Sequence, residues 1–241
     1  MSKNFSNNFL LRKLHQITGI VPLGIFFGVH MFTNSKAMNG AAVFNDAVGD
    51  IHHLPYLLFI ETFGIFLPLL YHSVYGMMIS AEARINTNYN YGRNWLYIFQ
   101  RVTGVFLFIF LLFHLLHFRW GFFGSFGLTQ IAVAGNAEKA FTIVSADFKV
   151  LWVLIFYIFG VAATAWHLAY GLFLFAVDWG IVIGEKAQSL LLKGVAAVGI
   201  GLFAIGTNAA FSFVRPCGLL PGFMCEQKVE KVEKVNESKK F

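Results

Sequence analysis

The sequence predicts an all-α integral membrane protein with five transmembrane helices, four of them forming a bundle, and its composition and hydropathy pattern both support this fold class. Of the 241 residues, 57% are hydrophobic and 12% are charged, and phenylalanine occupies 29 positions. A soluble domain has about 25% charged residues. The chain therefore belongs in a lipid bilayer, and its net charge of +6 bears on membrane topology before it bears on nucleic-acid binding, which we do not expect.

Five apolar stretches have the length of a membrane span, which takes about 20 apolar residues in a helix. We expect them to belong to one transmembrane domain over residues 1–214, followed by a polar tail over residues 215–241. In the tail, Cys217 and Cys225 either form a disulfide or remain two free thiols. The predicted helices cover residues 14–32, 56–80, 96–118, 149–177 and 190–214.

The distribution of positive charge predicts how the chain is oriented. Cytoplasmic connections of membrane proteins carry an excess of lysine and arginine. These residues are concentrated before the first span, between the second and third, and between the fourth and fifth. We therefore expect a cytoplasmic N-terminus and an external C-terminus. We also expect the first span to be retained rather than cleaved as a signal peptide, because Pro22 and His30 suit a membrane helix.

A histidine motif occurs twice within the predicted spans. His72-Ser73-Val74-Tyr75-Gly76 is followed 95 residues later by His167-Leu168-Ala169-Tyr170-Gly171. An ionisable side chain within a membrane segment is costly and usually functional. Two such histidines in one local context indicate a pair.

A second repeat gives another pair of histidines. Gln16-Ile17-Thr18-Gly19 leads eleven residues on to His30, and Gln100-Arg101-Val102-Thr103-Gly104 leads ten residues on to His114. Nitrogen ligands that face each other across a helix bundle hold a haem iron from both sides. Four histidines in two matched pairs therefore predict two b-type haems.

Position along each helix predicts how the histidines pair. The first and third spans run in one direction and carry their histidines toward the outside, whereas the second and fourth carry theirs toward the inside. With helix midpoints near Leu23 and Pro68, His30 lies about 10 Å outside the bilayer centre and His72 about 6 Å inside it. We predict an outer pair, His30 and His114, and an inner pair, His72 and His167. Each ligand is expected to donate its other ring nitrogen to a carbonyl or hydroxyl oxygen.

Glycines accompany all four motifs, and we expect Gly19, Gly76, Gly104 and Gly171 to leave room for a flat porphyrin. Gly76 and Gly171 lie one turn after the histidine of their motif. The alternative is that these small residues serve helix packing. The repetition of the motif favours the ligand.

Polar residues near the histidines are candidates for supporting roles. Glu61 lies on the face of His72 but about 16 Å toward the outside by helical rise, which makes it a candidate proton relay, unless it reaches surface water. His117, close to the outer surface, is interpreted as a residue that reaches water and is not a ligand. Candidates for holding the propionates of the inner haem, or alternatively for contacting lipid headgroups, are Arg12, His15, Gln16, Gln100 and Arg101.

Several blocks of sequence are shared with one known family. They are Arg12-x-x-His15, Gly19-Ile20-x-Pro22-x-Gly24, His30, Pro68-Leu69-x-Tyr71-His72-x-x-Tyr75-Gly76, Arg93-Asn94-Trp95, residues 100–104 and His114. With these blocks the chain resembles, over roughly residues 10–214, the five-helix, two-haem cytochrome b membrane anchor of succinate dehydrogenases from Gram-positive-type bacteria. This anchor belongs to the succinate:quinone oxidoreductase and fumarate reductase family.

The resemblance implies a multi-pass subunit of the bacterial cytoplasmic membrane, with a flavoprotein subunit and an iron–sulfur subunit docked on its cytoplasmic face. Those subunits would carry out the succinate chemistry. Electrons would pass through the inner and then the outer haem to menaquinone, and Glu61 would exchange protons there.

Two alternatives account for membrane histidines in other ways. One is a dihaem cytochrome b subunit of a hydrogenase or formate dehydrogenase. The other is a haem-free anchor or transporter whose histidines line a polar path. The matched repeats and a fifth span without histidine favour the first interpretation.

Overall fold

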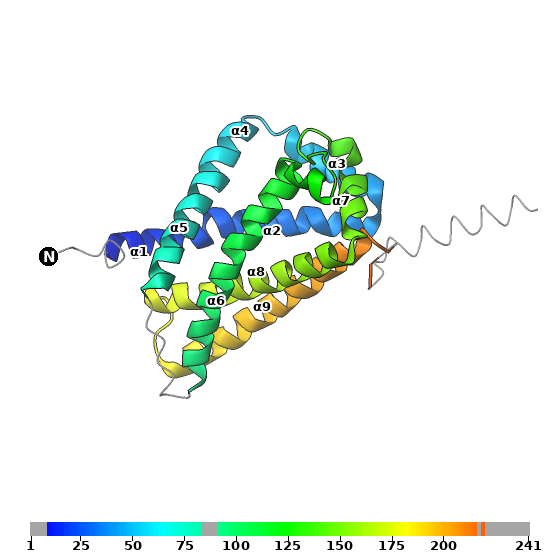
Figure 1. The fold of residues 1–241 in the computed structure, drawn as a ribbon. Helices are drawn as coiled ribbons and strands as arrows, with labels where there is room; N and C mark the ends of the chain where they lie inside the picture. Colours follow the sequence, from blue (N-terminus) through cyan, green and yellow to red (C-terminus); the bar gives the residue numbers. More distant parts are fainter. Residues whose placement is uncertain (1–8, 83–90, 216–217, 220–241) are drawn as a thin grey trace, which may run out of the picture. The chain divides into compact units, whose positions relative to one another are not determined.

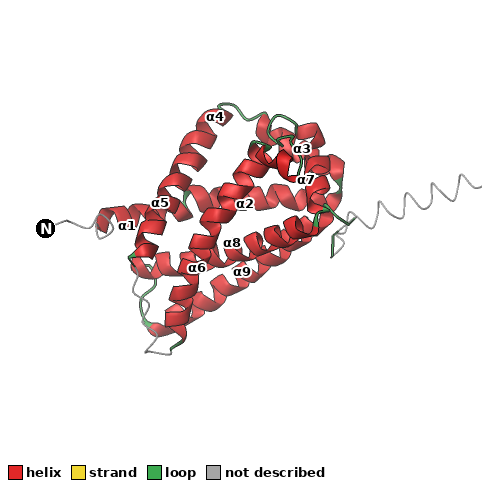
Figure 2. Cartoon of the chain, in the orientation of Figure 1, coloured by secondary structure: helices red, strands yellow, loops and turns green. Residues whose placement is uncertain are grey.

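The described part of the chain is entirely helical. The computed structural model describes residues 9–82, 91–215 and 218–219, and no strand occurs within these residues (Figures 1 and 2). The predicted all-α fold with five membrane-length helical stretches is confirmed, whereas the orientation of the N-terminus stays a prediction. Cys217, Cys225 and most of the expected tail lie outside the described residues. The five stretches are Phe9–Asn39, Leu57–Ala81, Gly92–Arg119, Leu151–Asp178 and Glu185–Ser212.

The first span consists of two α-helices, α1 (Phe9–Ile20) and α2 (Pro22–Ser35), followed by a short 3₁₀ helix, η2 (Lys36–Asn39). The two α-helices meet at Val21, because Pro22 has no backbone N–H and its ring collides with the preceding turn. Helix α1 begins before the predicted start at residue 14, so Arg12 and Lys13, which were expected to precede the span, lie within a helix.

The second span contains α4 (Leu57–Phe59), a π-helical stretch η3 (Ile60–Phe66) and α5 (Leu67–Ala81). The π-helical turns end next to Pro68, which lies in the first turn of α5. A π-helix is rare and is frequently found at functional sites. Glu61 lies within η3.

The remaining spans are α6 (Gly92–His114) with the π-helical η4 (Leu115–Arg119), α8 (Leu151–Asp178) and α9 (Glu185–Ser212). The connections between the predicted spans also contain helices, which the hydropathy pattern did not predict. Two of these helices bury apolar residues with helical spacing, such as Phe44 and Val48, a pattern too short to register as a span. The helices of the connections are α3 (Ala41–His52), α7 (Ala140–Phe148), and the short 3₁₀ helices η5 (Phe122–Phe126) and η6 (Ala137–Lys139), and the two that bury apolar residues are α3 and α7.

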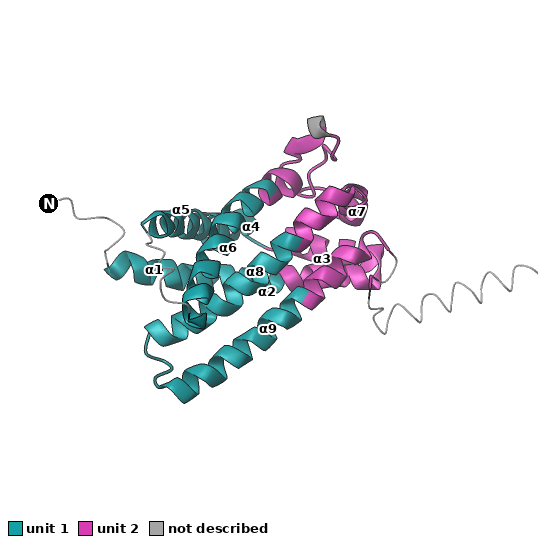
Figure 3. Cartoon of the chain, turned by 60° about the horizontal axis from the view of Figure 1, so that its bottom comes forward, with its two compact units in different colours: residues 1–29, 55–113, 159–203 teal, residues 30–54, 114–158, 204–241 magenta. Residues whose placement is uncertain are grey.

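The chain divides into two compact units, each built from several helices (Figure 3). The first unit contains the inner pair of histidines and the second contains the outer pair. The first unit comprises Met1–Val29, Pro55–Phe113 and Phe159–Phe203, and the second comprises His30–Leu54, His114–Ile158 and Ala204–Phe241.

In the first unit, small residues bring helices into close contact. The Tyr71 hydroxyl of α5 donates a hydrogen bond of 2.8 Å to the Leu11 carbonyl of α1. At Gly160 of α8, the ring of Phe110 from α6 occupies the space that a β-carbon would need. Close backbone approach at small residues is how membrane helices gain packing energy.

In the second unit, helices α3 and α7 pack against the end of α9 through aromatic rings. The ring centroids of Phe44 and Phe141 lie 5.0 Å and 5.1 Å from that of Phe213. Asn45 joins α3 to the start of α7, because its amide donates to the Glu138 carbonyl (2.7 Å) and accepts from the Phe141 amide (2.8 Å). This side chain therefore caps the N-terminal turn of α7.

We predict that Asn45→Ala lowers the stability of the second unit by about 1–2 kcal/mol, the usual cost of losing a helix cap. The measurement is thermal unfolding of the detergent-solubilised protein. Asp46→Ala, which changes the exposed neighbouring residue, is the control. Equal unfolding temperatures for the two variants would contradict the capping role.

Candidate functional site

The inner pair of histidines is brought together in the first unit. The rings of His72 on α5 and His167 on α8 have centroids 6.4 Å apart and planes at 86°. Two imidazoles on one first-row metal ion, each nitrogen at about 2.1 Å, have ring centroids roughly 6 Å apart. The observed separation therefore fits two ligands of one iron.

The Nδ1 atoms of the inner pair have the expected oxygen partners. Nδ1 of His72 lies 2.9 Å from the carbonyl oxygen of His15, which can only accept, so this nitrogen is the donor. Nδ1 of His167 lies 3.3 Å from the Thr103 hydroxyl, whose own hydrogen points to the Phe99 carbonyl at 2.8 Å. Both contacts place the proton on Nδ1 and leave Nε2 available to a metal, as is usual for histidine ligands.

Two of the glycines that were expected to leave room for a porphyrin leave room for these imidazoles. A β-carbon on Gly19 would collide with Cε1 of His72, and one on Gly104 would lie 3.1 Å from Cε1 of His167. Gly76 adjoins His15 in the same way, at 3.0 Å, whereas Gly171 has only Gln100 nearby, at 3.6 Å. The Thr-Gly repeat thus serves the inner pair, although its spacing had linked it to His30 and His114. Contact between these glycines and a porphyrin stays a prediction.

Three of the five propionate candidates carry unsatisfied polar atoms. His15 stacks on His72 with ring centroids 4.0 Å apart. Among the described residues, Nδ1 of His15, Oε1 of Gln100 and Nε of Arg101 are buried without a hydrogen-bond partner. Leaving such a group unpaired costs about 1–3 kcal/mol. Donors on His15 and Arg101 suit carboxylates, so this end of the inner site fits the polar edge of a haem.

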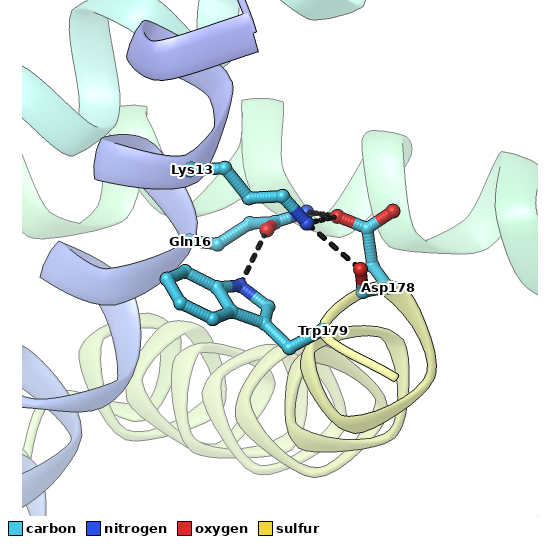
Figure 4. Close-up of polar contacts among 4 residues, drawn as sticks. All are labelled: Lys13, Gln16, Asp178 and Trp179. Atoms are coloured by element: carbon cyan, nitrogen blue, oxygen red, sulfur yellow. Dashed lines mark hydrogen bonds and ion pairs between the residues drawn. The ribbon is translucent and has the colours of Figure 1, made fainter. Parts of the chain in front are cut away.

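The other two candidates, Gln16 and Arg12, lie on α1, and the Gln16 amide has protein partners at both ends (Figure 4). Its nitrogen donates to the Asp178 carboxylate at 2.8 Å, and its oxygen accepts from the Trp179 indole at 2.9 Å. Lys13 forms an ion pair of 2.6 Å with the same carboxylate. These contacts clamp α1 to the end of α8, and a role for Gln16 or the exposed Arg12 at a propionate stays a prediction.

The outer pair is also brought together, in the second unit. The rings of His30 on α2 and His114 on α6 have centroids 5.7 Å apart and planes at 80°. This separation again fits two ligands of one iron. The ring of His114 is flanked by Tyr157 at 5.7 Å and by Phe118 at 6.0 Å.

His117 is buried, with 1% of its surface exposed, so the expectation that it reaches water was wrong. Its Nε2 lies 2.9 Å from the Asp147 carboxylate and its Nδ1 lies 3.0 Å from the Tyr157 hydroxyl. Because both ring nitrogens have protein partners, the interpretation of His117 as a non-ligand agrees with the structure.

Asp147, which lies on α7, was not predicted from the sequence to belong to a site. Besides His117, it accepts hydrogen bonds from the backbone amide and hydroxyl of Thr129, at 2.8 Å and 2.7 Å. Burial alone would raise the pKa of this carboxyl, but the hydrogen bonds from His117 and Thr129 outweigh it and lower the pKa below its usual value. The available signal was an aspartate next to Phe148 in an otherwise apolar stretch.

Glu61 lies in the first unit, in the π-helical stretch η3, and is half-buried. The outer pair belongs to the second unit. The expected position of Glu61 beside the outer pair therefore stays a prediction.

Comparison with known proteins gives two matches. A family described as succinate dehydrogenase/fumarate reductase transmembrane subunit matches residues 83–207. The chain is also similar to the succinate dehydrogenase cytochrome b558 subunit of Bacillus subtilis (strain 168), with 37% identity over 210 residues. That alignment covers 87% of this chain and 98% of the relative. A cytochrome b subunit implies bound haem b.

We predict that Gly19→Ala weakens haem retention about 10–100-fold, the range typical of changes around a ligand histidine. The new methyl group would overlap the His72 ring. Haem content of the purified protein after extended washing is the measurement. The control is Gly28→Ala, because, apart from its chain neighbours and the backbone of its own helix, no described atom lies within 4 Å of the corresponding β-carbon. Full haem content in Gly19→Ala would contradict the seating of His72.

Proposed function

Because the chain belongs to the succinate dehydrogenase/fumarate reductase family of transmembrane subunits, we propose that it is the dihaem cytochrome b anchor of a succinate:quinone oxidoreductase. In this role it carries electrons between an iron–sulfur subunit and membrane menaquinone. The observation that supports this most strongly is the presence of two histidine pairs from four different spans, at ring separations of 6.4 Å and 5.7 Å. A hydrogenase subunit or a haem-free transporter lacks comparable support.

The proposed ligands are His72 and His167 for the inner haem and His30 and His114 for the outer haem. When bound, the two b haems supply one-electron redox groups that the side chains of this protein lack. The protein's own part is to hold each imidazole in one tautomer and one plane. At the inner pair, the His15 carbonyl and the Thr103 hydroxyl do this.

At the inner site, the donors of His15 and Arg101 are proposed to bind the haem propionates. Their buried nitrogens lack partners among the described residues, and a carboxylate would satisfy both. Gln100 has a different main role, because its amide donates to the His167 carbonyl at 3.0 Å and so fixes the ligand helix.

The proposed partners are a flavoprotein subunit and an iron–sulfur subunit on the cytoplasmic face, which would carry out the succinate chemistry. The chain is a multi-pass membrane protein, and we place it in the bacterial cytoplasmic membrane. The excess of lysine and arginine on alternate connections supports this placement of the soluble subunits. Menaquinone is proposed to react near the outer pair.

We predict that replacing any one of the four ligands by alanine removes one haem and retains the other. His72→Ala and His167→Ala should abolish reduction of the remaining haem by succinate, because the link to the soluble subunits is lost. His30→Ala and His114→Ala should preserve it. Haem content and succinate-reduced spectra of the purified complexes are the measurements, and two haems in all four variants would disprove the assignment.

Glu61 is the proposed proton-exchanging group at the menaquinone site. We predict that Glu61→Gln slows quinone reduction by about 100-fold or more, the usual effect of removing a proton-transfer group. Haem content and haem reduction by succinate should not change. Glu138→Gln, at an exposed position, serves as the control. An unchanged turnover rate in Glu61→Gln would exclude this role.

A further inference from the structure

The second unit contains three buried polar residues that are joined by hydrogen bonds. The proposed transfer of electrons does not use them. Asp147, His117 and Tyr157 have exposed fractions of 3%, 1% and 5%. They lie on three separate elements, α7, η4 and α8. A buried carboxylate paired with imidazole is expensive to desolvate and weak evidence for stability. We therefore expect the Asp147–His117 pair to have a role other than stabilising the fold.

With a neutral His117 imidazole, the partners of these three residues assign a direction to each hydrogen bond. The two Thr129 groups already donate to Oδ1 of Asp147, and the ionised carboxylate can only accept. Nε2 of His117 is therefore the donor to Oδ2, at 2.9 Å. Its Nδ1 then accepts from the Tyr157 hydroxyl at 3.0 Å. This arrangement of protons, with a neutral imidazole, satisfies all three residues.

Tyr157, at the other end of this hydrogen-bonded set, contacts the proposed haem ligand His114. The Tyr157 ring meets the His114 imidazole with centroids 5.7 Å apart and planes at 64°. On another side, Phe118 meets the same imidazole at 6.0 Å and 76°. Phe118 in turn stacks on His117, with centroids 4.0 Å apart. Tyr157 and Phe118 thus each contact both His114 and His117.

We propose that Asp147, His117 and Tyr157 are positioning residues for the outer haem: together they hold the plane of the His114 imidazole and so would set the angle between the His30 and His114 planes when the haem is bound. The present angle between the His30 and His114 planes is 80°. Hydrogen bonds and packing around an axial ligand are levers by which a protein tunes haem iron. This inference rests on the proposed outer haem and adds to it the residues that determine its electronic character.

The anchoring of Asp147 also joins the loop that contains Thr129 to the ligand. The loop donates two hydrogen bonds to the carboxylate, and the carboxylate holds His117. A change at Asp147 is therefore expected to reach the His114 ring through two intermediate residues, His117 and either Tyr157 or Phe118. The ring itself loses no direct partner.

The test uses the purified complete complex with Asp147→Asn and Tyr157→Phe. Tyr157→Phe keeps the ring beside His114 and removes only the hydroxyl, so it decides the matter if Asp147→Asn fails to assemble. The control is Ile143→Ala, which removes a buried apolar side chain one turn before Asp147 on the same helix. The readouts are haem content, the electron paramagnetic resonance signal of each ferric haem, which reports the angle between its imidazole planes, and each midpoint potential.

We expect two haems in every variant. In Asp147→Asn and Tyr157→Phe the resonance signal and potential of the outer haem should shift, while those of the inner haem stay at the wild-type values. In Ile143→Ala both haems should match the wild type. Unchanged outer-haem signals in Tyr157→Phe, or equal shifts in the control, would overturn the inference and leave the proposed function intact. A wild-type complex without the outer haem would overturn both.

Discussion

The structure depends on how an imidazole is fixed inside an apolar bilayer. A polar ring nitrogen buried without a partner costs free energy, and a ring that is free to turn cannot hold a metal in one geometry. At the inner pair both requirements are met by the neighbouring helix. Gly19 leaves space for the His72 ring, and the His15 carbonyl accepts its Nδ1 proton. Gly104 and Thr103 do the same for His167. The packing of α1 against α5 and of α6 against α8 is thereby tied to the ligand geometry.

The two pairs are fixed by different chemistry. The inner pair relies on the backbone and on a threonine within the spans, so its geometry follows from helix packing alone. The outer pair has an aromatic enclosure around His114 that is braced by Asp147, a residue of a connecting helix outside the spans. Variation in the connection can therefore change the surroundings of one pair without changing the other. Such separation would allow two haems in one protein to differ in redox character.

The features that could be predicted from the sequence are those marked by a hydropathy pattern or by a repeated motif. The spans followed from hydropathy, and the four histidines followed from two repeats that can be read directly along the chain. Their pairing by depth agrees with the contacts in each unit. The features that were not predicted depend on contacts between segments that are distant in the sequence. Asp147 carries no motif, and its burial arises only when α7 folds onto η4. Gly19 was assigned to the histidine of its own span because helical spacing says nothing about the neighbouring helix, where His72 fills the gap.

The central claim is that this chain holds two haems, one between each pair of histidines. The most direct measurement is the ratio of haem b to this chain in the purified wild-type complex, together with the resonance spectrum of its ferric state. We expect a ratio of two and two low-spin signals, each typical of nearly perpendicular imidazole planes, because the histidine planes meet at 86° and 80°. A ratio of one or zero, or a single signal, would contradict it.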